Sequence, residues 1–230
     1  MIAVLPLLPA SVVPPRFFRV QFLSVLAVIV IAGLFSTDIA NVTFWIALGL
    51  TGLFSLAGSI VWHTDEAPFG RTLFYLTLAA MLGAVAIRRE FDPLLIDDLL
   101  GAAMLGSAIS SMLMGHSYLI APAMSMTPLL RLLGCLTATL ALRILSACVG
   151  LWWWTRPAQA TTLEMETALW LGARWLLGLL APMVLVWMSW ETARIRSTQS
   201  ATGILYVVTI VVFLGELLSL LLVEKTGLML

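Results

Sequence analysis

Seven long apolar stretches, separated by short polar connections, constrain this chain more than any other feature of its sequence. A helix needs roughly 20 apolar residues to cross a bilayer core of about 30 Å. In lipid, only a helix or a closed barrel satisfies every backbone hydrogen bond. We therefore predict an all-α, polytopic integral membrane protein in which residues 17–230 form a single seven-helix domain with short loops. The predicted spans are residues 17–36, 42–62, 71–88, 97–119, 128–154, 165–190 and 203–223.

The composition supports this fold class and excludes others. Hydrophobic residues make up 61% of the chain and charged residues 10%, against roughly 45–50% and about 25% in soluble domains. Twelve Lys and Arg balance twelve Asp and Glu, so no basic excess exists to neutralise nucleic-acid phosphates. We expect membrane lipids as surroundings, no nucleic-acid partner, and a location in a bacterial-type inner membrane.

The first 16 residues are apolar but contain four prolines, at 6, 9, 14 and 15, which interrupt a helix. They lack the cationic start of a signal peptide. We therefore predict a proline-containing N-terminal arm that either lies at the membrane interface or forms a loose lead-in to the first span.

The cations in the short loops suggest an orientation by the positive-inside rule. With a cytoplasmic N-terminus, six arginines lie inside and four cations lie outside, so we predict an outside C-terminus. The six inner cations are Arg16, Arg19, Arg71, Arg131, Arg194 and Arg196, and the four outer ones are Arg88, Arg89, Arg156 and Lys225.

Three charged residues lie well inside predicted spans: Arg143, Arg174 and Glu216. From a rise of about 1.5 Å per residue, Arg143 lies roughly 3 Å, and the other two about 4–5 Å, outside the midplane. An arginine near the centre of a membrane helix costs about 2.5–3.5 kcal/mol on insertion scales. Three such residues at one depth on consecutive helices predict one cluster.

Two interpretations of this cluster remain open. In the first, Glu216 pairs with an arginine and fixes the helices structurally. In the second, the three residues line a polar ligand pocket or a proton path in the outer half of the membrane. Two arginines and one glutamate leave about one positive charge uncompensated, which a ligand or another chain would have to balance.

Two histidines, His63 and His116, end inward-running spans and are the candidate axial ligands of a b-type haem. We do not predict a firm metal site, because an interfacial histidine is more often a satisfied polar residue. His116 and the nearby Tyr118 are alternatively contacts for a quinone or a lipid head group.

The segment between the sixth and seventh spans is also polar and lies on the predicted inner side. Its candidate contacts for a quinone, cofactor or lipid are Arg194, Arg196, Gln199 and Ser200. The segment leads into a helix N-terminus, whose free amides favour anions and carbonyls. The simpler interpretation is a helix cap with arginines that follow the positive-inside rule.

The absence of any sizeable loop favours a chain that is not catalytic alone. Our leading hypothesis is an integral membrane subunit of a larger energy-conserving electron-transfer complex that binds quinone and, as a second cofactor, haem b. The first alternative is a proton-coupled small-solute transporter that uses Glu216. The second is a non-catalytic membrane scaffold or assembly subunit for other membrane-complex subunits.

Overall fold

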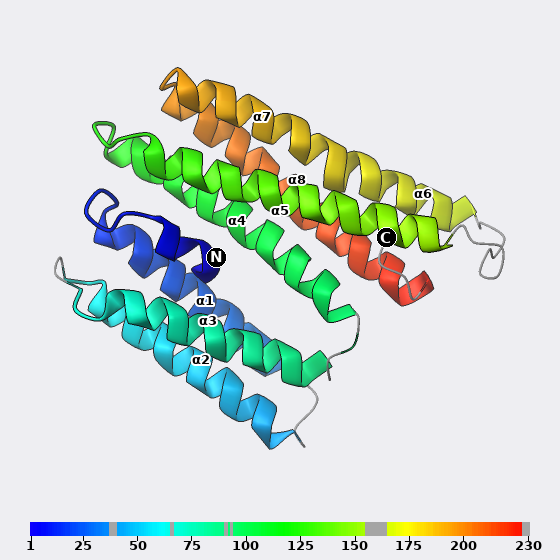
Figure 1. Cartoon of the computed structure of the whole chain (residues 1–230), viewed down its shortest axis with the longest axis horizontal. Helices are drawn as coiled ribbons and strands as arrows, with labels where there is room; N and C mark the ends of the chain where they lie inside the picture. Colours follow the sequence, from blue (N-terminus) through cyan, green and yellow to red (C-terminus); the bar gives the residue numbers. More distant parts are fainter. Residues whose placement is uncertain (37–40, 65–66, 90–91, 93, 155–164, 227–230) are drawn as a thin grey trace. The chain divides into compact units, whose positions relative to one another are not determined.

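The computed structural model describes residues 1–36, 41–64, 67–89, 92, 94–154 and 165–226. This part of the chain consists of helices joined by short turns, without strands (Figure 1). A short 3₁₀ helix, η1, precedes the longer helices, and one span contains a π-helical turn, η2. The elements are η1 (Ile2–Leu7), α1 (Pro15–Phe35), α2 (Val42–Val61), α3 (Gly70–Arg89), α4 (Leu94–Ile120), α5 (Thr127–Trp154), α6 (Met165–Ala173), η2 (Arg174–Leu180), α7 (Ala181–Arg194) and α8 (Thr198–Thr226).

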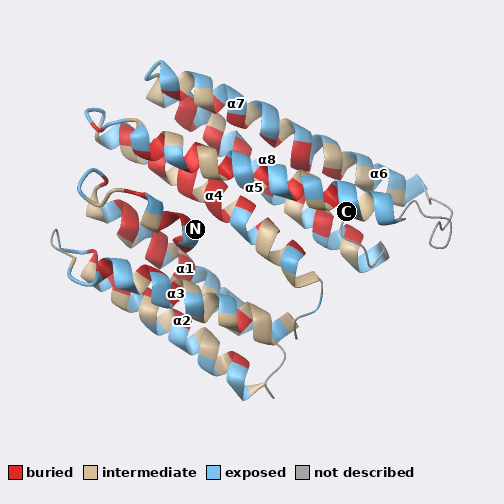
Figure 2. Cartoon of the chain, in the orientation of Figure 1, coloured by how far each residue is buried: buried red, intermediate tan, exposed pale blue. Residues whose placement is uncertain are grey.

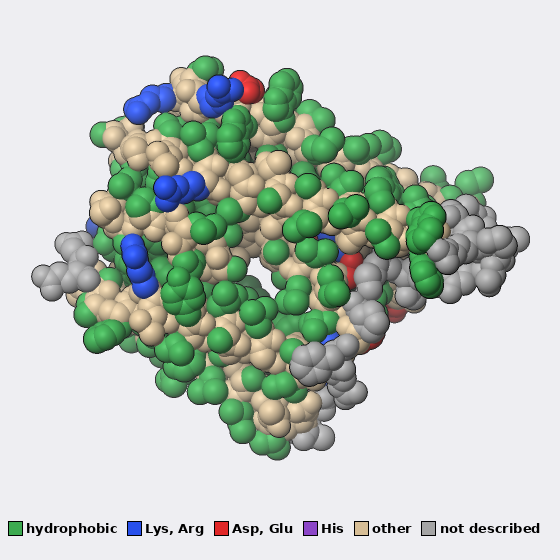
Figure 3. All heavy atoms as spheres, viewed as in Figure 1, with side chains coloured by type: hydrophobic (Ala, Val, Ile, Leu, Met, Phe, Trp, Pro, Cys, Tyr) green, Lys and Arg blue, Asp and Glu red, His purple; other side chains and the backbone are tan. Residues whose placement is uncertain are grey.

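Seven of the described helical segments are long and apolar enough to cross a membrane, with α6, η2 and α7 forming one continuous segment. This confirms the predicted all-α polytopic fold. Hydrophobic side chains are spread over the whole face drawn in Figure 3, as expected for lipid-facing helices. The direction of insertion and the type of membrane stay predictions.

The chain divides into two compact units, residues 1–95 and 96–230, and each is described by itself. The expectation that all seven spans form one domain stays a prediction. Unit 1 contains η1 and α1 to α3, and its core is aromatic. Phe18 packs on Trp62 with ring centroids 4.3 Å apart, and the Phe74 ring stacks against Trp62 at 5.5 Å and against Phe22 at 5.5 Å.

The N-terminal arm belongs to this packed core. Ile2 and Leu5 of η1 are fully buried, and the 3₁₀ helix contacts α1 and α3. The arm is therefore packed rather than loose, and its position relative to the membrane interface stays a prediction. A 3₁₀ turn accommodates Pro6, and the apolar side chains gain close contacts inside the unit that they would lack at the surface.

Unit 2 contains α4, α5, the continuous α6–η2–α7 span and α8 (Figure 1). Its buried positions, red in Figure 2, include many small and hydroxyl-bearing residues. Such residues allow close helix approach in membranes. Ser107 on α4 and Thr139 on α5 are hydrogen-bonded at 3.1 Å. Pro182 lacks an N–H for the Gly178 carbonyl, and the π-helical segment η2 ends two residues before Pro182, at Leu180.

Candidate functional site

A cluster of four charged side chains lies inside unit 2, and each comes from a different helical segment. Asp97 is on α4, Arg143 on α5, Arg174 on η2 and Glu216 on α8. The structure thus brings together the three charged residues that the sequence placed at one depth. We call Asp97, Arg143, Arg174 and Glu216 the charge cluster.

Arg143 is the most fully hydrogen-bonded member of the charge cluster. Its Nε donates to Glu216 Oε1 at 3.1 Å, and its Nη2 donates to Glu216 Oε2 at 3.0 Å and to Ser219 Oγ at 2.9 Å. Its Nη1 donates to Asp97 Oδ1. All three nitrogens of this 2% exposed arginine are therefore satisfied, as a buried guanidinium requires.

Arg174 differs sharply, although it is fully buried at 0% exposure. Its Nη2 donates to Glu216 Oε1 at 3.2 Å. Its Nε and Nη1 have no hydrogen-bond acceptor among the described residues. A buried donor left without a partner costs about 1–3 kcal/mol, and more when it carries charge.

Glycines give the charged side chains their space. A Cβ at Gly101 of α4 would overlap the Glu216 carboxylate, so glycine at this position lets the carboxylate lie against α4 without a shift. Gly178 of η2 and Gly215 of α8 meet backbone to backbone, and a Cβ added at Gly178 would lie 2.7 Å from the Gly215 Cα. This close approach places Glu216, the next residue on α8, within reach of Arg174.

Asp97 corrects the charge balance that we expected from the sequence. With Asp97 included, two arginines face two carboxylates and the charge cluster is formally neutral. Asp97 escaped the sequence analysis because it lies in the first turn of its helix, where an acidic residue ordinarily faces water. The predicted excess of one positive charge was the signal that could have identified it.

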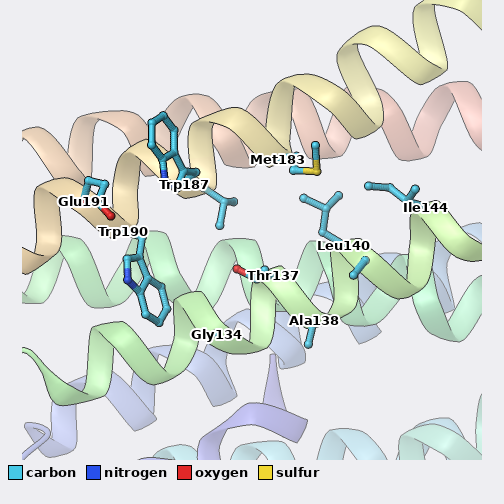
Figure 4. Close-up of a pocket in the computed structure, with 11 residues that line it drawn as sticks. Gly134, Thr137, Ala138, Leu140, Ile144, Met183, Trp187, Trp190 and Glu191 are labelled. Carbon is cyan, nitrogen blue, oxygen red and sulfur yellow. The ribbon is translucent and has the colours of Figure 1, made fainter.

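A groove with a volume of about 780 Å³ lies between α5 and α7, on the part of α7 that leads to its C-terminal end (Figure 4). It is mostly apolar. Glu191 and two tryptophans lie at one end, and Met183 and Ile144 lie at the other. Met183 and Glu191 are eight residues apart, which corresponds to about 12 Å of helix. The two tryptophans are Trp187 and Trp190, and the other lining residues are Gly134, Thr137, Ala138, Leu140, Ala141 and Val186.

The Glu191 end of the groove adjoins the polar turn between α7 and α8. Arg194 donates from Nη1 to Glu191 Oε1 at 3.5 Å, and these side chains are 61% and 50% exposed. Arg196 follows in the left-handed conformation with φ of 57°, and Gln199 and Ser200 are exposed in the first turn of α8. The predicted inner contacts on this turn therefore lie next to one end of an apolar groove.

The remaining predicted contacts do not line this groove. Tyr118 is buried and donates its hydroxyl to the Ser125 carbonyl at 2.5 Å, which closes the turn between α4 and α5. His116 is exposed on α4. His63 is exposed in unit 1, where Arg19 Nη1 lies 2.9 Å from its Nδ1.

A haem site stays a prediction. His63 lies in unit 1 and His116 in unit 2. Methionine can also ligate haem iron, but on α4 Met104 and Met114 are fully buried whereas His116 is exposed, so they lie on different faces of the helix. In the described part of the chain, no three His, Cys, Asp or Glu residues gather as metal ligands.

Comparisons with protein families, with curated proteins and with solved structures found no match to this chain. Two features of unit 2 bear on its function, the charge cluster and the groove. The charge cluster is neutral and largely closed. The groove is open, apolar and connected to a polar turn, which is the general form of a small-molecule binding site.

Proposed function

We propose that this chain is a membrane subunit of a larger electron-transfer complex and that it binds a quinone in the groove between α5 and α7. The observation that carries the proposal is the combination of an apolar groove of about 780 Å³ with two tryptophans and an ion pair at one end. Ligand pockets of about 300–1,000 Å³ bury most of a drug-sized molecule.

A quinone matches both ends of this groove. Its flat ring is a partner for the Trp187 and Trp190 rings, because aromatic groups favour offset or edge-on packing. Its carbonyl oxygens are acceptors for the exposed guanidinium of Arg194. Its apolar tail fits the segment that leads to Met183 and Ile144. The protein groups bind and orient the quinone, and the redox chemistry belongs to the quinone itself.

Gly134 provides the test, because it lines the groove and a Cβ added there meets no atom within 4 Å. A Gly134→Leu side chain would therefore fill the groove without displacing the backbone. Gly203→Leu is the matched control, since Gly203 is also open but lies on α8 outside the groove.

The experiment measures the quinone retained per mole of purified protein, and the affinity for decylubiquinone from quenching of tryptophan fluorescence. We expect wild type and Gly203→Leu to bind alike and Gly134→Leu to bind at least about tenfold more weakly, a loss of 1.4 kcal/mol. Equal binding by all three proteins, or by none, contradicts the proposal.

The scaffold alternative is favoured by a different observation, the closed bonding of Arg143, which connects α4, α5 and α8. Its signature would be loss of a partner complex on deletion, with no bound quinone. The transporter alternative, with Glu216 as the titrating group, is tested by Glu216→Gln, because proton-coupled uptake that survives this change contradicts it.

A further inference from the structure

The groove between α5 and α7 has a charged group at its polar end. Among the described residues that line the groove, the charged one is Glu191, which lies at the same end as Trp187 and Trp190 (Figure 4). Its Oε1 atom accepts from Arg194 Nη1 at 3.5 Å, and its Oε2 atom has no partner in the described part of the chain. A carboxylate accepts hydrogen bonds and cannot donate them. A ligand that donates a hydrogen bond is therefore the natural partner of Oε2.

The donors at this end of the groove do not distinguish the oxidised and reduced forms of a quinone. They are the indole N–H groups of Trp187 and Trp190 and, beside the groove, the guanidinium of Arg194. The Thr137 hydroxyl is already used, because it donates to the Leu133 carbonyl at 2.9 Å. A quinone carbonyl oxygen and a quinol hydroxyl oxygen both accept hydrogen bonds. These donors therefore bind either form.

The Glu191 carboxylate does distinguish the two forms. A quinol hydroxyl can donate to Oε2, and a hydrogen bond to a charged group is stronger than one between neutral groups. A quinone presents only oxygen lone pairs to the same carboxylate, and two acceptors repel each other. A site that bonds a hydroxyl group discriminates against an analogue that lacks it. Because a hydroxyl also accepts, one quinol hydroxyl is a partner for both Glu191 and Arg194.

We propose that Glu191 makes the groove selective for the reduced, hydroxyl-bearing form of the quinone, the quinol. This inference rests on the proposed binding of a quinone in the groove, and it adds the redox form that is held more tightly and the residue that decides it. Because Glu191 is 50% exposed, water competes for its carboxylate and limits the preference. We expect the quinol to bind about tenfold more tightly than the quinone, which raises the two-electron midpoint potential of the bound molecule by about 30 mV.

The test compares the affinities of the full chain for decylubiquinone and decylubiquinol. The protein is held in phosphatidylcholine nanodiscs under anaerobic conditions, so that the quinol stays reduced. The amount of each form bound in excess of protein-free nanodiscs is measured by extraction and chromatography over a range of ligand concentrations. The ratio of the two dissociation constants reports the preference, and wild type is expected to favour decylubiquinol about tenfold, or 1.4 kcal/mol.

Glu191→Gln tests the role of the carboxylate. The glutamine side chain has the same shape, but its amide nitrogen donates and so pairs with a quinone carbonyl. We expect the affinity for decylubiquinol to fall, that for decylubiquinone to stay or rise, and their ratio to approach one. A merely structural role would change both affinities alike. Glu224→Gln is the matched control, because Glu224 is an exposed glutamate on α8 outside the groove.

The outcomes separate this inference from the groove proposal. Equal binding of both forms by wild type overturns the quinol preference while quinone binding in the groove stands. A preference for decylubiquinol that survives in Glu191→Gln overturns the role of Glu191. Binding of neither form contradicts the groove proposal and the inference that rests on it.

Discussion

The interiors of the two units are built from different chemistry, although their helices are similarly apolar. Unit 1 packs rings: Phe18, Phe22, Trp62 and Phe74 lie with centroids 4.3 to 5.6 Å apart. Unit 2 buries ions, and the charge cluster joins α4, α5, η2 and α8. Lipid tails are as apolar as leucine, so burial from water does not drive helix association in either unit.

The two interiors should respond differently to the loss of a single side chain. Ring packing depends on many weak contacts, so the loss of one contact lowers the stability only slightly while the neighbouring contacts remain. An ion network depends on few strong bonds and leaves a buried charge when one member is removed. Single substitutions in the interior should therefore lower the free energy of unfolding more in unit 2 than in unit 1.

The largest effect is expected for Arg143→Met, which removes the Arg143 partner of Asp97 and two of the three hydrogen bonds that Glu216 accepts from the arginines. We predict a loss of about 3–5 kcal/mol of unfolding free energy, measured by denaturant unfolding in bicelles. Arg196→Met, an exposed arginine on the α7–α8 turn, is the control. A loss below 1 kcal/mol for Arg143→Met would show that the charge cluster does not stabilise unit 2.

The aromatic core of unit 1 should be less sensitive to a single truncation. Phe22 is fully buried, whereas Phe35 on the same helix is 81% exposed. Phe22→Ala should cost about 2–3 kcal/mol, below the roughly 3–5 kcal/mol in water-soluble cores, because the separated helices still face lipid. Phe35→Ala should cost almost nothing in the same assay. A Phe22→Ala loss larger than that of Arg143→Met would reverse the comparison.

The contact between Gly178 and Gly215 should give an intermediate to small effect. Gly178→Ala adds a methyl group into a backbone contact, and we expect a cost of about 1–3 kcal/mol from overpacking. Gly172→Ala has free space and should be neutral or slightly stabilising, because alanine is the better helix former. Equal stabilities for the two variants would mean that η2 and α8 do not approach closely at this point.

The smallest effect on stability is expected at the interfacial ion pair. Arg194 and Glu191 are half-exposed or more, and such pairs contribute about 0–1 kcal/mol. Arg194→Gln should leave unfolding unchanged within that range while weakening decylubiquinone binding about fivefold, the worth of one hydrogen bond of about 1 kcal/mol. Unchanged quinone affinity would remove Arg194 from the proposed binding site.

Span positions followed from length and hydropathy, which act locally along the chain. The second helix, for example, was predicted at 42–62 and runs over Val42–Val61. The last helix begins at Thr198, five residues before the predicted start, because its polar first turns bond within the helix. Thr202 Oγ1 donates to the Thr198 carbonyl at 2.7 Å, so a threonine that resembles a loop residue fits the helix.

The groove and the role of Asp97 could not be predicted from the sequence. Both depend on which helix faces meet, and no local sequence pattern specifies this. Small residues at Gly134, Ala138 and Ala141 recur on one face of α5, opposite the bulky Trp187 and Trp190 of α7. Their spacing was visible in the sequence, but small residues in membrane helices ordinarily mark close packing. Only the position of α7 shows that part of this face is left open.

Photolabelling tests quinone binding most directly. Protein in bilayers is irradiated with an azido-quinone that carries an apolar tail, and labelled peptides are mapped by mass spectrometry with and without excess decylubiquinone. We predict labelling on α5 and α7 near Gly134 and Trp190. This labelling should be lost with excess decylubiquinone and in Gly134→Leu, and should be kept in Gly203→Leu. Labelling spread over the lipid-facing surface and unaffected by competitor would contradict quinone binding in the groove.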